Sequence, residues 1–167
     1  MSLQLEMKIE GADRIMGMLR SLPAEVVSKR GGPVKNALRR GARVIQRQVV
    51  ANLQASLNAT SDEGERYSTG LLLKNVVVTR GKEPVGVRGE RFLVRIRRKS
   101  YPDRGGKPVT TQRTAGFKEY GTEKQPAEPF IRPAAQQRAA EAITVATSTL
   151  LADLDKIATR LMRQVGT

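Results

Sequence analysis

The feature that most constrains the fold is a long amphipathic helix predicted over residues 34–57. Apolar residues recur there at steps of three or four, the spacing that gathers side chains on one face of an α-helix. They are Val34, Leu38, Ala42, Ile45, Val49, Leu53 and Leu57. Pro33 suits the first turn, because the amide hydrogen that proline lacks would find no acceptor there. A face of this length needs other elements to cover it.

The same helix carries a basic stripe, whose members recur every four residues: Lys35, Arg39, Arg43 and Arg47. Like charges at this spacing destabilise an isolated helix by about 0.2–0.5 kcal/mol per pair. The stripe therefore suggests an acidic partner, either a nucleic acid or a protein surface. The alternative is a solvated face with mobile side chains and no partner.

A second basic face is predicted over residues 80–118, which hold twelve bases and three acids in a chain of net charge +14. In the strand predicted over 92–98, apolar residues alternate with others, so one side is expected in the core and the other is basic. Residues 99–113 contain two prolines and two glycines and are interpreted as a long, mobile, basic loop. The bases of this strand and loop are Arg95, Arg97, Arg98, Lys99, Arg104, Lys107 and Arg113.

The predicted fold is α+β and forms a single domain over residues 1–167. An antiparallel sheet of about four to five strands is expected to be packed by one long central helix and one long C-terminal helix, plus a short N-terminal helix over 13–22. The C-terminal helix is expected to begin near Pro133, and its alanine-rich first half allows another helix to approach closely. The predicted strands are 3–9, 71–80, 85–88, 92–98 and 117–120.

The composition argues against an enzyme, because the 167 residues include no His and no Cys. Thiol catalysis, zinc sites with His or Cys ligands and serine nucleophiles activated by His are thereby excluded. Asp62, Glu63 and Glu65 form the densest carboxylate cluster, but their spacing is not that of a calcium-binding loop, and a solvated loop explains them. A serine–lysine pair is conceivable, although no pair is singled out. We expect no catalytic residue, metal, cofactor or small-molecule substrate.

Other classes of function lack a signature. The sequence from Gly86 to Gly89 has the GxxG form of an RNA-binding KH loop, but a turn between strands explains it better. No phosphate-binding glycine loop occurs. No apolar run approaches the roughly 20 residues that a membrane span needs, and residues 1–6 lack the features of a secretory signal. We therefore expect no membrane partner, and synthesis and assembly in a cytoplasm.

The most specific segment is 117–134, FKEYGTEKQPAEPFIRPA. It is interpreted as a strand, a turn at Gly121 and a rigid, proline-bounded link into the last helix. Phe130 and Ile131 are expected to fix that helix to the core. Arg132 is badly placed at a helix N-terminus, which favours anions. Its partner is therefore expected to be a carboxylate, either Glu119 or Glu128.

This segment resembles the signature of the small tail-component proteins of long-tailed bacteriophages, the tail-completion or neck proteins encoded between head-completion and tail-tube genes. A second similarity is Thr69-Gly70-x-Leu72 after the long helix, and a third is the opening order of strand, Gly11, short helix and basic helix. A related family of contractile-tailed phages has a similar ending, which leaves the phage type open. Glu119 adjoins the matching residues of the main segment. These are Tyr120, Gly121, Thr122, Pro126, Ala127, Pro129, Phe130, Ile131, Arg132, Pro133 and Ala134.

The resemblance implies a structural virion protein that forms a ring, expected to be a hexamer, at the head-proximal end of the tail and takes part in head–tail joining. Its implied partners are other copies of itself, neighbouring neck or connector proteins, and tail-tube or tail-terminator proteins. Double-stranded DNA passing through the ring is a further potential partner. The loop over 99–113 spans about 30 Å when extended, which suits an arm toward a neighbour. The alternative is a non-specific nucleic-acid-binding protein that uses the two basic faces.

Overall fold

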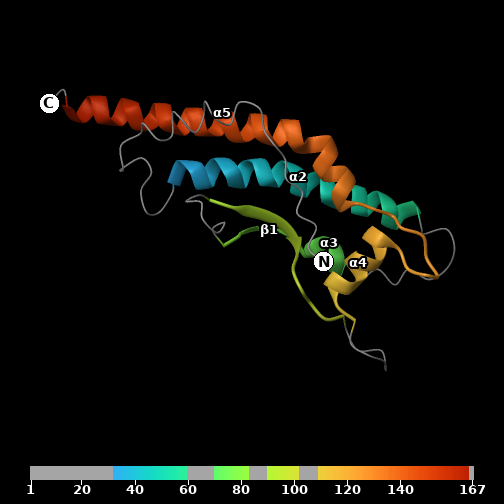
Figure 1. The fold of residues 1–167 in the computed structure, drawn as a ribbon. Helices are drawn as coiled ribbons and strands as arrows, with labels where there is room; N and C mark the ends of the chain where they lie inside the picture. The colour runs from blue at the N-terminus through green and yellow to red at the C-terminus, as the bar shows by residue number, and fades with distance from the viewer. Residues whose placement is uncertain (1–31, 60–69, 83–89, 102–108, 166–167) are drawn as a thin grey trace.

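Two long antiparallel helices dominate a computed structural model of the protein, which describes residues 32–59, 70–82, 90–101 and 109–165. Helix α5 lies on α2, and a small sheet lies under the other side of α2, with α3 and α4 beside it (Figure 1). The elements in chain order are α2 (Gly32–Ala59), α3 (Leu71–Lys74), β1 (Val76–Arg80), β2 (Phe92–Ile96), α4 (Thr111–Tyr120) and α5 (Ile131–Val165). The fold is α+β, with helices predominating.

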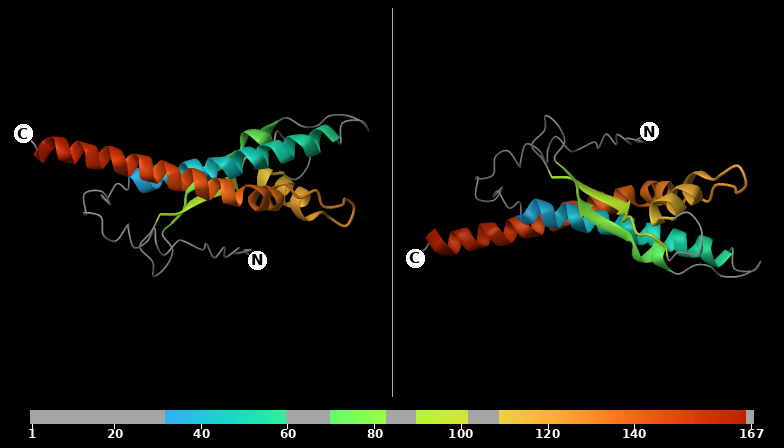
Figure 2. Two further views of the ribbon diagram at one scale, coloured as in Figure 1. Left: turned by 90° about the horizontal axis from the view of Figure 1, so that it is seen from above. Right: turned by 90° about the horizontal axis from the view of Figure 1, so that it is seen from below.

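Helices α2 and α5 approach closely because small residues line their contact. A Cβ atom added to Gly41 would lie 2.6 Å from the carbonyl oxygen of Ala142 and 3.2 Å from the Cβ of Ala146. Ala37 and Val44 are buried one turn to either side of Gly41. The predicted close approach at the alanine-rich half of α5 is confirmed. Figure 2 shows the two helices running alongside each other, with the C-terminal end of α5 extending beyond α2.

The hydrophobic core lies between α2, the sheet and the first turn of α5. Val49 and Leu53 of the predicted apolar face are buried in it, and Gln46 Nε2 donates to the Val76 carbonyl oxygen at 2.7 Å. Because α2 is covered on two sides, it has a second buried face that the periodicity did not predict. The buried residues of the core are Val49, Leu53, Leu72, Val76, Ile96, Ala115, Phe130 and Ala134.

The described residues form one antiparallel sheet of two strands, with Val76 opposite Ile96 and Arg80 opposite Phe92. The alternation predicted for β2 is found at its end, where Ile96 is buried and Arg95 is exposed, whereas residues 92–94 are all half-buried. The strand ends at Ile96 and not at the predicted residue 98. The four to five strands expected from the sequence are not found in this part of the chain. The predicted strand 3–9, helix 13–22 and strand 85–88 lie outside the described residues.

Two predictions of local structure were wrong. Residues 117–120 form the last turn of α4 and not a strand. The helix begins after Thr110, whose hydroxyl accepts from the Arg113 amide at 3.4 Å, and it buries Thr111, Ala115 and Glu119 at steps of four. Because two of these three buried residues are polar, the helical period was not visible as hydrophobicity.

The second error concerns the start of β1. Residues 71–74 form one helical turn, α3, which follows Gly70 in the left-handed region at φ 65°. The Asn75 side chain then closes this turn by donating to the Leu71 carbonyl oxygen at 2.7 Å. The strand predicted from residue 71 therefore begins at Val76.

Both ends of the predicted loop 99–113 lie in described residues and pair with each other. The Tyr101 amide donates to Val109 O and the Thr111 amide to Lys99 O, each at 2.9 Å. Ser100 and Thr110 form an antiparallel bridge between these bonds. The ends of the segment are thus held together, and α4 begins within it. Arg104 and Lys107 lie outside the described residues.

None of the helices in the described ranges combines the length and hydropathy that crossing a membrane would require.

The close α2–α5 contact predicts opposite effects for two glycine-to-alanine substitutions. We expect Gly41→Ala to destabilise the protein by about 1–3 kcal/mol, because the added methyl group overlaps the α5 backbone. Gly116→Ala is the matched control in α4, where a Cβ meets nothing within 4 Å. Alanine's higher helix propensity should stabilise that variant by about 0.5–1 kcal/mol. Urea unfolding followed by circular dichroism measures both, and equal effects of the two substitutions would contradict the packing described here.

Candidate functional site

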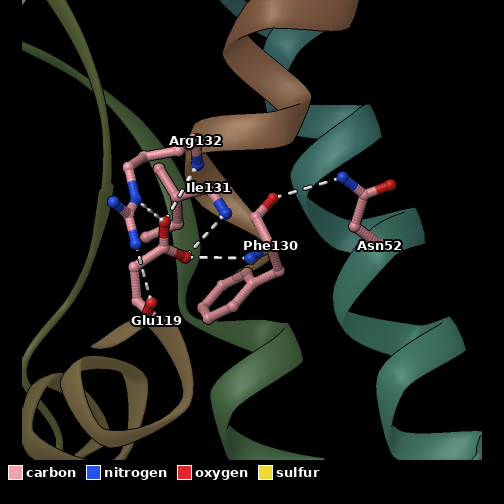
Figure 3. Close-up of polar contacts among 5 residues, drawn as sticks. All are labelled: Asn52, Glu119, Phe130, Ile131 and Arg132. Atoms are coloured by element: carbon pink, nitrogen blue, oxygen red, sulfur yellow. Dashed lines mark hydrogen bonds and ion pairs between the residues drawn. The ribbon is translucent and has the colours of Figure 1, made fainter. Parts of the chain in front are cut away.

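Residues 117–134, the segment with the family resemblance, are called the signature here. They are arranged around one buried carboxylate. Glu119, at the end of α4, is 3% exposed. Its Oε2 accepts the amides of Phe130 and Ile131, each at 2.9 Å, and its Oε1 accepts the amide of Arg132 at 3.1 Å (Figure 3). These are the three amides at the start of α5 that have no acceptor within the helix. The next residue, Pro133, has no amide hydrogen. We call this arrangement the Glu119 cap.

Arg132 completes the cap from outside. Its Nε donates to Glu119 Oε1 and its guanidinium NH2 group to the Glu119 backbone oxygen, both at 3.1 Å. The guanidinium carbon also lies 5.1 Å from the centre of the Tyr120 ring, within the range of a cation–π contact. The predicted carboxylate partner of Arg132 is confirmed as Glu119. A base just inside the helix N-terminus is tolerated because a buried anion lies between it and the amides.

The ionisation of Glu119 follows from these contacts. Burial alone would raise its pKa, but hydrogen bonds from the amides of Ile131, Phe130 and Arg132 and from the Arg132 side chain outweigh burial. The pKa of Glu119 therefore lies below its usual value. A carboxylate that accepts this many hydrogen bonds is held ionised and bonded, so it is not available as a general acid or base.

A chain of amide side chains links the cap to α2. The Phe130 carbonyl oxygen accepts from Asn52 Nδ2 at 3.3 Å, and Asn52 Oδ1 accepts from Gln48 Nε2 at 2.8 Å. Gln48 Oε1 in turn accepts from Arg138 Nε of α5 at 2.8 Å. Sequence reasoning missed Asn52 and Gln48. The one sequence feature that could have indicated them is that both are polar residues beside the apolar face of α2.

The rest of the signature forms a turn between α4 and α5. Gly121 has φ 75°, and a Cβ there would lie 2.8 Å from the Ala127 amide nitrogen. Thr122 and Gln125 form a bridge across this turn. The signature thus divides into buried residues that hold the helices and exposed residues at the turn. Among the residues that match the family, the exposed members are Tyr120, Thr122, Pro126, Ala127, Pro129 and Arg132, the last of which lies in α5.

The second similar motif is only partly described, because Thr69 lies outside the described residues. Gly70 has the left-handed conformation before α3, and Leu72 is buried in the core. Both residues therefore contribute to the fold: Gly70 at the start of α3 and Leu72 in the core.

The described residues include a serine–lysine contact. Lys118 Nζ lies 2.6 Å from both Ser56 Oγ and Glu128 Oε2, and Ser56 Oγ also donates to Glu128. The hydrogen bonds from Lys118 and Ser56 lower the pKa of Glu128. A lysine ammonium paired with a carboxylate has no lone pair to take a proton from serine. The cluster therefore ties α2, α4 and the segment before α5 together and does not form a nucleophile.

The predicted basic residues fall on separate surfaces. On α2, Arg39, Arg43 and Arg47 are exposed, while Lys35 is half-buried and lies 3.6 Å from Glu90. Glu90 also accepts two hydrogen bonds from Arg80, at 2.7 and 2.8 Å. A pocket at this end of α2 is lined by Lys35, Asn36, Arg39, Val78, Arg80 and Phe92.

The bases of the second face do not join this stripe. Arg95 alternates with the buried Ile96 and so lies on the side of the sheet away from the core. Arg97, Arg98 and Lys99 follow the strand and are exposed, as is Arg113 in the first turn of α4. Arg95 therefore lies on the side of the sheet that faces away from α2.

Within the described ranges, no three His, Cys, Asp or Glu side chains are grouped so that they could hold a metal ion. Comparison of the chain with protein-family models, with curated proteins and with solved structures found no match.

The Glu119 cap predicts a large loss of stability on substitution. We expect Glu119→Gln to lower the free energy of unfolding by about 1.5–3 kcal/mol, because charge-assisted hydrogen bonds are lost. Glu119→Ala should cost more, since three amides lose their acceptor. Glu123→Gln is the matched control at an exposed position, with an expected change within about 0.5 kcal/mol. Equal stability of Glu119→Gln and Glu123→Gln in urea unfolding would refute the role given to the cap.

The lowered pKa of Glu119 predicts how this loss depends on pH. The unfolded protein binds a proton at a higher pH than the folded protein does, so acid selectively stabilises the unfolded state. The stability difference between wild type and Glu119→Gln should be constant above about pH 5 and shrink as the pH falls below about 4.3, the ordinary pKa of glutamate. Glu128 is present in both proteins, so the lowering of its pKa contributes equally to both stabilities and does not affect their difference. A difference that stays the same from neutral to acid pH would contradict the direction of the shift.

Proposed function

We propose that this protein is a structural component of a long-tailed bacteriophage virion. It forms or completes a ring, a hexamer, at the head-proximal end of the tail and takes part in head–tail joining. It assembles in the host cytoplasm with neighbouring neck, connector, tail-tube or tail-terminator proteins. This role rests on the resemblance of residues 117–134 and 69–72 to the tail-completion and neck proteins.

The observation that best supports this role is how the signature residues are used. Glu119, Phe130 and Arg132 have their polar groups bonded within the chain or are buried in its core. A signature that served catalysis would leave a reactive group free to meet a substrate. Here the Glu119 carboxylate is already hydrogen-bonded to the amides of the helix that it caps. Four of the remaining members, Thr122, Pro126, Ala127 and Pro129, are exposed in the proline-bounded segment between α4 and α5, which suits contact with another protein.

The charge supports an acidic partner. A hexamer would carry six times the net charge of +14, and such a concentration of charge needs a counterpart. We assign most of it to acidic protein surfaces of neighbouring rings, because a channel that grips DNA would hinder its ejection. Arg39, Arg43 and Arg47 are exposed on α2 and available for this contact.

The second candidate function is non-specific binding of nucleic acid. It is favoured by the same row of exposed arginines, because arginines one turn apart on a helix can follow phosphate groups. The two candidates differ in whether DNA drives assembly and in how strongly salt opposes it.

Native mass spectrometry, from low to physiological salt and with and without short duplex DNA, separates the two candidates. We expect one discrete oligomer, six chains in mass, whose composition does not change when DNA is added. Heterogeneous DNA-bound species that vanish as salt rises would contradict the ring and support the nucleic-acid function.

Charge reversal gives an independent test of the α2 stripe. The triple variant Arg39→Glu, Arg43→Glu and Arg47→Glu changes the stripe. Lys74→Glu, Lys82→Glu and Arg91→Glu changes net charge equally at exposed positions elsewhere. If the stripe contacts a protein neighbour, only the first variant should lose assembly, as measured by sedimentation. If both variants assemble normally and lose DNA binding equally, the stripe has no specific role.

A further inference from the structure

Four large apolar side chains in the described part of the chain are exposed, and they lie in two places. Val109, Phe117 and Tyr120 are exposed by 41%, 40% and 60%, and all belong to α4 or the residues just before it. The fourth, Leu151, is 54% exposed on α5. Exposed apolar groups gathered on one element indicate a contact surface more than single ones do.

The exposed face of α4 combines aromatic rings with arginines. Arg113, Phe117 and Tyr120 follow at steps of four and three, so they share a side of the helix. The Arg113 guanidinium carbon lies 5.3 Å from the Phe117 ring centre, and that of Arg132 lies 5.1 Å from the Tyr120 ring centre. The only acid of α4, Glu119, is buried on the opposite side. Tyrosine and arginine are the residues that most often carry the energy of protein interfaces.

The second half of α5 offers a complementary surface. Leu151 and Asp155 are both exposed and lie four residues apart, on one face of the helix. No base of the described residues forms an ion pair with Asp155. Its neighbour Asp153 is different, because it accepts from Asn36 Nδ2 at 2.7 Å and lies 3.6 Å from Lys156 Nζ. The free carboxylate thus stands beside the exposed leucine.

These two surfaces cannot meet within one molecule. Helix α4 lies near the start of α5, whereas Leu151 and Asp155 flank Asp153, which is bonded to Asn36 near the start of α2, toward the other end of the molecule (Figures 1 and 2). A contact between two different surfaces of the same chain can repeat from one copy to the next. The copies close into a ring when a whole number of them completes a full turn.

We propose that the α4 face of one copy binds the distal α5 face of the next copy. Phe117 and Tyr120 pack against Leu151 of the neighbouring copy, and Arg113 pairs with its Asp155. The second copy is favoured over another occupant because this chain itself supplies the apolar group and the unpaired acid that the α4 face requires. The inference rests on the proposed ring and identifies the contact that builds it.

Charge exchange between the two surfaces tests this contact. We expect Arg113→Glu and Asp155→Arg each to raise the dissociation constant of the oligomer at least tenfold, as measured by analytical ultracentrifugation. The double variant Arg113→Glu/Asp155→Arg should recover most of the affinity, because the pair is restored with reversed sign. Both positions are exposed, so thermal unfolding of each variant should match wild type. Leu151→Glu should weaken the oligomer without rescue by either exchange.

A mismatched pair is the control. Arg91 is exposed and precedes the end of β2 that lies away from α4, so Arg91→Glu/Asp155→Arg should remain as weak as Asp155→Arg alone. An oligomer that none of these variants weakens would overturn the contact and leave the ring standing. Rescue by the mismatched pair would likewise overturn it. A wild-type protein that stays monomeric at every concentration and salt tested would overturn both the contact and the ring.

Discussion

The fold depends on the hydrogen bonds between the Glu119 carboxylate and the start of α5. A 35-residue helix begins in the core, where unpaired amides would be costly. Glu119 supplies acceptors for all three available amides, and Pro133 removes the fourth donor. The negative charge also opposes the positive end of the helix dipole. By joining the end of α4 to the start of α5, the cap fixes the direction in which α5 runs along α2.

The other features of the core follow from that direction. Once α5 lies antiparallel to α2, Gly41 faces the backbone of Ala142 and the two helices can approach closely. Asn52 and Gln48 then meet Phe130 and Arg138 along the same side. The proposed contacts with other copies depend on the same geometry, because it places α4 at one end of the molecule and Leu151 and Asp155 of α5 toward the other.

The sequence predicts the elements whose pattern is carried by hydrophobicity. Helix α2 and strand β2 were found in this way, since Val49, Leu53 and Ile96 follow simple periods. Helix α4 was missed because Thr111 and Glu119 are buried for their hydrogen bonds, which a hydrophobic pattern does not register. The dipole argument led from Arg132 to a carboxylate, Glu119 or Glu128, but it did not choose between them and gave no account of the three amides. The Asn52 chain could not be predicted, because it depends on which helix faces lie together.

The central claim is that Glu119 accepts the first amides of α5, and hydrogen exchange measures this most directly. Amides at a helix N-terminus normally exchange quickly because they lack an acceptor within the helix. Followed residue by residue by NMR in the intact protein, the amides of Phe130, Ile131 and Arg132 should exchange as slowly as those of the core around Leu53. They should become unprotected in Glu119→Ala, which removes the acceptor altogether. Fast exchange of these three amides in the wild-type protein would contradict the cap and the fold that depends on it.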